Sequence, residues 1–230
     1  MTTHFIGTSH LISLKKSLAA RQAKSRIGNF NCYWANNSIF QKPMVIGVDD
    51  SNIAAMSPAL IESWKKSGGS HIIKINEGDT IVFCGFANPI PEYAFLTDVD
   101  TVVSQACHRA WLSDALGISV LPASLMEAIV SMPVKVFILD APLWGSLKIE
   151  KTFKKSANPA RYAEFISHYE EFCNAKGIIF IRQPSDTLEI VDKKLATKVA
   201  YLKDDGYHLN EDGANMMSAA LEAAFDRAAI

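Results

Sequence analysis

The heptapeptide VKVFILD, residues 134–140, decides the fold class, because it is an almost unbroken apolar run that ends in an acid. Such a run is typical of a β-strand that is buried on both faces. Similar runs occur at THFIG (3–7), DTIVFCG (79–85) and GIIFIRQ (177–183), with helix-like segments between them. Strands that alternate with helices predict a mainly parallel sheet with helices on both faces, which is a three-layer α/β/α domain.

The helix signals are strongest where an apolar stripe at helical spacing lies between a capping residue and a glycine. Residues 158–177 start with Asn-Pro, end with glycine and carry such a stripe. In SPALIESWKKS, Ser57 is the expected N-cap and Pro58 the first helical residue. Two further helices are expected at about 9–24 and 211–228. Residues 27–56 are less regular, because turn residues interrupt the strand-like FNCYW and MVIGV.

Length and composition predict one ordinary globular domain that spans residues 1–230. A chain of 230 residues with 49% hydrophobic and 20% charged residues can bury a single core. The net charge of −1 gives no basic field for nucleic acid, and no apolar run is long enough to span a membrane. The four scattered cysteines predict neither a zinc site nor a disulfide framework. The apolar residues near the start belong to a core strand rather than a signal peptide, so we expect a cytoplasmic protein.

Polar residues follow several of the predicted strands, and ligands bind outside the carboxyl ends of strands in an open parallel sheet. Ser9 follows the first strand and opens a helix, while His208 and Asp205 share a loop before the last helix. His208 is a candidate base for the Ser9 hydroxyl, and Asp205 is a candidate partner for the second ring nitrogen. The Ser9 N–H and the Asn88 side chain are candidate donors to an oxyanion.

A local interpretation of the same residues stays open. Ser9 alone is more often a helix cap, and Asp205-Gly206 alone is more often a turn. His10 is a second candidate base, although a helical neighbour of Ser9 projects about 100° away from it. The joint pattern, with all groups at one edge of the sheet, favours the catalytic interpretation.

These residues resemble the motifs of the SGNH (GDSL-type) hydrolase superfamily. GTSH (7–10) is similar to the first block, with Thr8 in place of aspartate, and DGYH (205–208) to the C-terminal Asp-x-x-His. GFAN (85–88) is similar to the third block, stretched by one residue. The resemblance implies a flavodoxin-like architecture, Ser9 as nucleophile, His208 and Asp205 as its partners, and Asn88 as an oxyanion donor. The glycine of the second block is not assigned to any residue.

The resemblance also implies a serine esterase or O-acyltransferase without a metal or an organic cofactor. GTSH and RQPSDTL (182–188) are similar to members that modify bacterial surface glycans, so we expect a carbohydrate ester as substrate. Gly85, Arg182 and Trp144 are expected to contact it, and the basic loop 143–161 is either a lid for an anionic group or a solvated loop. The alternative is a glycan- or nucleotide-sugar-binding protein of the same fold without turnover. The sequence leaves the oligomeric state open.

Overall fold

A computed structural model describes most of the chain, and every structural statement below concerns its described residues. They are residues 1–21, 27–36, 39, 46–85, 104, 110, 123–143, 145 and 159–228.

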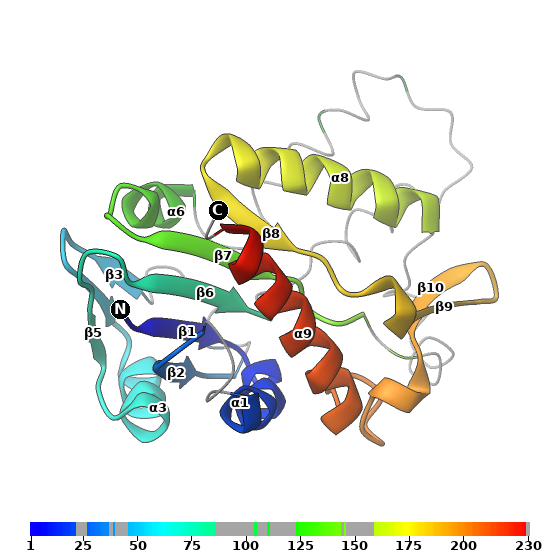
Figure 1. The fold of residues 1–230 in the computed structure, drawn as a ribbon, viewed down its shortest axis with the longest axis horizontal. Coiled ribbons are helices and arrows are strands. Elements are labelled where there is room, and N and C mark those ends of the chain that lie inside the picture. The colour runs from blue at the N-terminus through cyan, green and yellow to red at the C-terminus, as the bar shows by residue number, and fades with distance from the viewer. Residues whose placement is uncertain are drawn as a thin grey trace.

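The centre of the molecule is a five-stranded sheet in which every neighbouring pair is parallel (Figure 1). Its strand order is β2-β1-β6-β7-β8. Each of the two strands β1 and β6 is buried along its whole length, as expected for short apolar strands with helices on both faces. The bounds are Thr3–Gly7 for β1, Phe30–Trp34 for β2, Thr80–Cys84 for β6, Lys135–Leu139 for β7 and Ile178–Ile181 for β8. The predicted three-layer α/β/α fold is confirmed.

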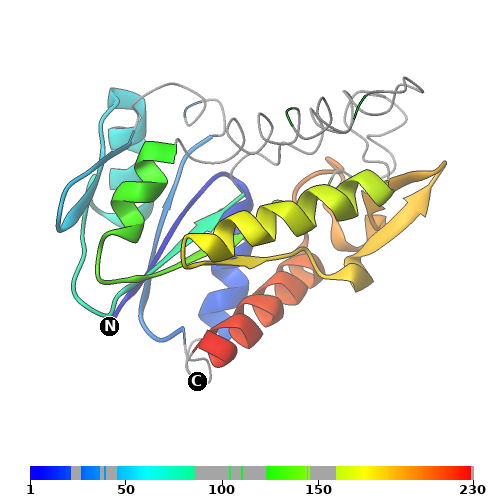
Figure 2. The ribbon, with the colours of Figure 1, turned by 90° about the horizontal axis from the view of Figure 1, so that it is seen from above.

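Two helical layers cover the two faces of this sheet (Figure 2). One layer contains α1 (His10–Arg21) and α9 (Glu211–Ala228), and the other contains α3 (Pro58–Gly68), α6 (Ala123–Val130) and α8 (Pro159–Ala175). Successive strand residues face opposite layers: Phe137 packs into the core with α1 and α9, and Ile138 into the core with the other three helices. The alternation explains why the strand sequences read as continuous apolar runs.

The predicted helices are present, with local signals at their ends. Ser57 caps α3, because its hydroxyl accepts a hydrogen bond from the Leu60 N–H at 3.3 Å, and Gly69 follows the helix at φ +79°. α1 begins one residue later than expected, at His10, and residues 22–24 of the predicted segment lie outside the described residues. Gly177 follows α8 at φ +72°.

Two small antiparallel sheets were not expected from a pattern that predicted only the parallel sheet. The strands β3 (Ile46–Val48), β4 (Asn52–Ala55) and β5 (Ile72–Lys74) pair in that order beside α3. A hairpin of β9 (Leu188–Val191) and β10 (Lys194–Thr197) follows β8. Its two-residue turn has positive φ at both Asp192 and Lys193.

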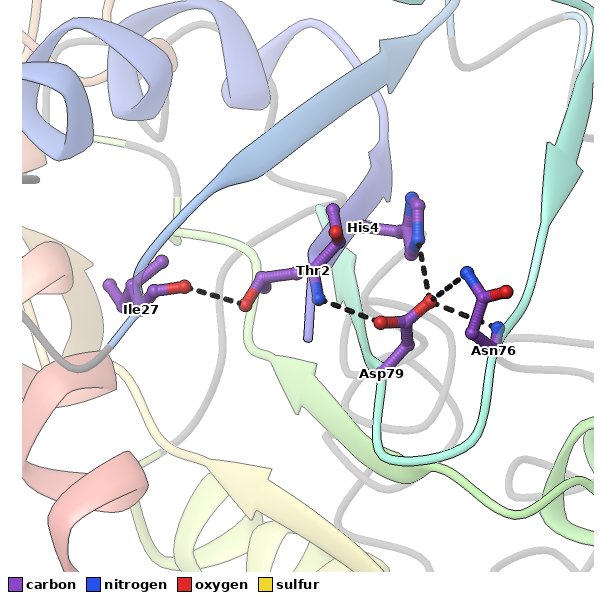
Figure 3. Close-up of polar contacts among 6 residues, drawn as sticks. Thr2, His4, Ile27, Asn76 and Asp79 are labelled. Carbon is purple, nitrogen blue, oxygen red and sulfur yellow. Dashed lines mark hydrogen bonds and ion pairs between the residues drawn. The ribbon is translucent and has the colours of Figure 1, made fainter.

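A polar cluster closes the end of the sheet at which β1 and β6 begin (Figure 3). The Asp79 carboxylate accepts hydrogen bonds from the Thr2 and Asn76 N–H groups at 2.7 and 3.0 Å. The His4 imidazole lies 3.5 Å from the same carboxylate. Burial lowers the pKa of His4, against the opposing effect of the Asp79 charge. The cluster therefore supplies hydrogen-bond partners for backbone groups at the amino ends of β1 and β6. This edge of the sheet lies opposite the edge where the strands end.

Among the described residues, no helix is long and apolar enough to span a bilayer. Cys32, Cys84 and Cys173 are buried free thiols, and Cys107 lies outside the described residues.

Candidate active site

Ser9 lies where β1 ends and α1 begins, at the carboxyl edge of the sheet. Thr8 fixes this junction, because its N–H donates to the Cys84 carbonyl at 3.1 Å and its buried hydroxyl donates to the Gly85 carbonyl at 2.9 Å. The Ser9 carbonyl accepts from the Ile12 N–H at 3.1 Å. The Ser9 N–H bonds to no acceptor among the described residues, so it is free to donate at the positive end of α1.

The loop 203–210 brings the other two residues to the same edge. The Lys203 N–H donates to the His208 carbonyl at 2.8 Å, and Gly206, at φ +74°, donates to the Lys203 carbonyl at 2.9 Å. Asn210 ends the loop as the cap of α9, because its side-chain oxygen accepts from the Gly213 N–H at 3.0 Å. Backbone bonds and a helix cap therefore hold the loop at both ends.

Ser9, His208 and Asp205 form a continuous hydrogen-bonded chain. The His208 Nε2 atom lies 2.8 Å from Ser9 Oγ, and its Nδ1 atom lies 2.7 Å from Asp205 Oδ2. An ionised carboxylate only accepts hydrogen bonds, so Asp205 holds the proton on Nδ1 and leaves Nε2 to accept from the serine hydroxyl. The structure thus brings together three residues that are separated by up to 199 positions.

Asp205 remains ionised because of the turn that it caps. Its Oδ1 atom accepts from the N–H groups of Tyr207 and His208 at 3.1 and 3.0 Å. Burial opposes the charge, but these bonds and the His208 ring outweigh it and lower the pKa of Asp205 to about 2. Asp205 is therefore a turn residue and the histidine partner at once, so the local interpretation and the catalytic one describe the same carboxylate.

His10 lies beside the chain of three but does not replace His208. Its ring centroid is 5.2 Å from that of His208. Burial, followed by the charge of His208, lowers the pKa of His10 to about 4. Its Nδ1 atom is buried without a hydrogen-bond partner among the described residues. A neutral imidazole therefore packs against His208, while His208 is the ring that contacts the serine.

Comparisons with known proteins show similarity in fold to several solved structures. No family model and no curated protein matches the sequence. A solved structure of a candidate platelet activating factor from Streptococcus pneumonia matches with a TM-score of 0.51 at 15% identity, over 96% of this chain and 82% of that chain. An extracellular lipase from Streptomyces rimosus matches with a TM-score of 0.49 at 15% identity, over 97% and 99%. A GDSL-like lipase from Bacteroides thetaiotaomicron matches with a TM-score of 0.47 at 12% identity, over 99% and 88%.

The chain shares its three-layer α/β/α fold with the structure from Streptococcus pneumonia. Within this fold, GTSH and DGYH occupy the two places expected from the motif resemblance, one after β1 and the other before α9. Thr8, which replaces the aspartate of the first block, bonds the end of β1 to the end of β6. The departure from the family pattern therefore leaves the serine supported.

The remaining predicted site residues are only partly placed. Asn88 and Trp144 lie outside the described residues, as do the lysines of the basic loop 143–161, which are Lys148, Lys151, Lys154 and Lys155. Gly85 follows β6 at φ +66°, and a Cβ atom there would lie 2.6 Å from Thr8 Oγ1. Arg182 lies at the end of β8 and forms an ion pair with Glu170 of α8. Binding roles for these residues remain predictions.

One buried acid near the site had no assigned role in the sequence-based prediction. Asp140 directly follows β7, and its Oδ2 atom accepts from the Tyr162 hydroxyl at 3.1 Å. Burial raises the pKa of Asp140 to about 7, against the opposing hydrogen bond from Tyr162. Gln183, which follows β8, donates to Thr187 and Thr197 at 3.0 and 2.9 Å, and so ties the end of β8 to the hairpin. The sequence signal was the acid that ends the most apolar strand.

Proposed function

We propose that this protein is a serine esterase or O-acyltransferase that acts on acyl esters of carbohydrates. The observation that carries the proposal is the chain from Ser9 Oγ through the His208 ring to Asp205 Oδ2, with contacts of 2.8 and 2.7 Å. These are the distances at which a base can take a serine proton while a carboxylate orients that base.

In the first half-reaction, Ser9 Oγ attacks the carbonyl carbon of the ester and His208 Nε2 takes the hydroxyl proton. The resulting oxyanion accepts a hydrogen bond from the Ser9 N–H, and we propose the Asn88 side chain as a second donor. As the tetrahedral intermediate collapses, the bond to the alcohol oxygen breaks and His208 gives its proton to that oxygen. The products are the free alcohol and an acyl group on Ser9.

In the second half-reaction, His208 removes a proton from the incoming nucleophile, which attacks the acyl carbon. The bond to Ser9 Oγ then breaks, and the proton returns to the serine. If the nucleophile is water, the product is a carboxylic acid; if it is a sugar hydroxyl, the acyl group is transferred. The residues are the same in both cases, so access of water decides between hydrolysis and transfer.

The carbohydrate substrate is proposed from the resemblance of the GTSH and RQPSDTL motifs to glycan-modifying proteins. We further propose a cytoplasmic glycan precursor. The buried thiols of Cys32, Cys84 and Cys173 form no disulfide among the described residues, which suits a reducing compartment.

The test is release of acetate from peracetylated glucose and from p-nitrophenyl acetate by the purified protein. We expect turnover by the wild type and none above background by Ser9→Ala. Ser131→Ala, at an exposed serine outside the site, serves as the matched control for folding in thermal melts. A folded wild-type protein that binds the sugar but releases no acetate would instead indicate the glycan-binding alternative.

A further inference from the structure

A groove lies between α1 and α9, beside the Ser9–His208 pair. These two helices run side by side on the same face of the sheet (Figures 1 and 2). The groove has a volume of about 280 Å³, near the lower end of the range for small-molecule sites. Its walls include Ile12, Ser13 and Lys16 of α1, and Lys203, Asn210 and Glu211 from the loop and the start of α9.

Both walls of the groove begin next to the proposed catalytic residues. On α1, residues three, four and seven positions after Ser9 share one face of the helix, and these are Ile12, Ser13 and Lys16. On the other wall, the Lys203 N–H donates to the His208 carbonyl, and Asn210 follows His208 by two residues. A substrate whose ester lies at Ser9 can therefore place an adjoining group in the groove.

The lining carries more positive than negative charge. Among the described residues of the lining, Glu211 is the one carboxylate, whereas Lys16 and Lys203 contribute two ammonium groups. Neither ammonium group forms an ion pair or a hydrogen bond with the described part of the chain. The positive charge of Lys203 is close enough to contribute to the lowered pKa of His10. Two exposed, unengaged cations beside a proposed nucleophile favour an anionic ligand.

The other polar groups of the groove differ in their freedom to bind. Ser17 donates to Asn215 at 2.7 Å, so this pair joins the two walls. Asn210 is engaged as the cap of α9 and in bonds to the Ala200 and Leu202 carbonyls. Ser13 retains a hydroxyl for a ligand, and Ile12 presents an exposed apolar surface. The available set is therefore two cations, the Glu211 carboxylate, one hydroxyl and one aliphatic side chain.

We propose that this groove binds the phosphorylated sugar part of the acyl ester, with Lys16 and Lys203 on the phosphate. The volume fits one sugar unit, whose hydroxyl-bearing edge suits Ser13 and whose apolar face suits Ile12. This inference deepens the proposed function, because it names the substrate as an acylated sugar that carries a phosphate. A sugar phosphate monoester and a nucleotide-diphosphate sugar share this chemistry.

Binding is measured by titration calorimetry on Ser9→Ala, which removes turnover but none of the groove. We expect glucose 6-phosphate to bind more tightly than glucose, and UDP-glucose to reveal whether a nucleotide diphosphate is the preferred source of phosphate. Lys16→Gln and Lys203→Gln, each added to Ser9→Ala, should weaken glucose 6-phosphate binding about fivefold apiece, the factor for opposite charges about 4 Å apart in water.

Lys15→Gln is the matched control, because it removes the same charge from the neighbouring residue of α1. Lys15 lies over the Trp34 ring, with Nζ 5.3 Å from its centroid, and does not line the groove. The affinity of the Ser9→Ala protein that also carries Lys15→Gln should stay within twofold of that of Ser9→Ala alone for glucose 6-phosphate. Thermal melts of the three lysine variants separate loss of the ligand from loss of folding.

The result separates this inference from the proposed catalytic function. Hydrolysis of p-nitrophenyl acetate with equal affinities for glucose and glucose 6-phosphate would overturn the groove assignment and leave the esterase intact. Binding of glucose 6-phosphate that depends on both lysines, without any acetate release, would support the groove and reject the esterase. Tighter binding of hexanoate than of glucose 6-phosphate would also overturn the assignment, because it would make the groove an acyl site.

Discussion

Asp205→Asn removes the charge from the acid and keeps nearly the same shape. In the wild type, Oδ1 accepts from the N–H groups of Tyr207 and His208, and Oδ2 lies 2.7 Å from His208 Nδ1. The asparagine carbonyl can keep the two backbone bonds, which leaves its NH₂ group facing the ring. His208 Nδ1 must then accept a hydrogen bond instead of donating one, so Nε2 carries the ring proton and cannot take the one on Ser9.

We therefore expect kcat/KM for p-nitrophenyl acetate to fall by about 10⁴-fold, the loss that follows when a triad histidine has the wrong tautomer. The fall should persist across neutral pH, because the pKa of Asp205 is lowered to about 2 and the wild-type carboxylate stays ionised there. Asp204→Asn is the control: the neighbouring residue is exposed and loses the same charge. A folded Asp205→Asn protein with activity within tenfold of the wild type would refute the assigned role.

Three further predictions concern stability. Burial raises the pKa of Asp140 from 3.8 to about 7, so the folded state favours the protonated acid. The wild-type free energy of unfolding should therefore fall by up to about 4 kcal/mol as pH rises through that range. Asp140→Asn should remove this pH dependence in denaturant titrations. Gly85→Ala should lower the melting temperature more than Gly177→Ala. Both residues have positive φ, but of the two only Gly85 has neighbours that a Cβ atom would meet. Equal losses of melting temperature would count against this reasoning. Asp79→Asn should lower the free energy of unfolding by about 1–3 kcal/mol at neutral pH, because it weakens the buried hydrogen bonds that Asp79 accepts. The difference in stability between variant and wild type should shrink as pH falls through the lowered pKa of Asp79, because the wild type then loses the same charge. A stability difference that is unchanged in acid would contradict this.

The parallel strands and the chain of three residues could be predicted for one physical reason. Strands buried on both faces must be apolar along their whole length, and their carboxyl ends meet at one edge of the sheet. Ser9 follows such a strand, and the loop that carries His208 begins the last helix. Because these carboxyl ends share one edge, residues that lie far apart in the sequence could be predicted to lie close together there.

The small antiparallel sheets could not be predicted from the same pattern. MVIGV (44–48) was predicted to be strand-like and contains β3, but β3 and β5 have only three residues each, too short for a periodic signal that would indicate their antiparallel pairing. The turn between β9 and β10 uses Asp192 and Lys193 at positive φ, without the glycine that marks such a turn in a sequence.

The contacts of Asp140 and His10 were not predicted for a different reason, because their partners come from distant segments. Tyr162 looked like part of an apolar helix face, yet its hydroxyl donates to Asp140, 22 residues earlier in the chain. His10 does project differently from Ser9, but the loop that carries His208 approaches α1 closely enough for the two rings to lie 5.2 Å apart. Helical geometry alone describes one helix and not the loop that packs against it.

The most direct test of the central claim is covalent labelling with a fluorophosphonate, followed by mass spectrometry of the peptides. If His208 activates Ser9 through the 2.8 Å contact, the wild-type protein carries the label on Ser9 alone, His208→Ala reacts far more slowly, and Ser9→Ala does not react. A folded wild-type protein that stays unlabelled, or one that is labelled on another serine while Ser9 remains free, would contradict it.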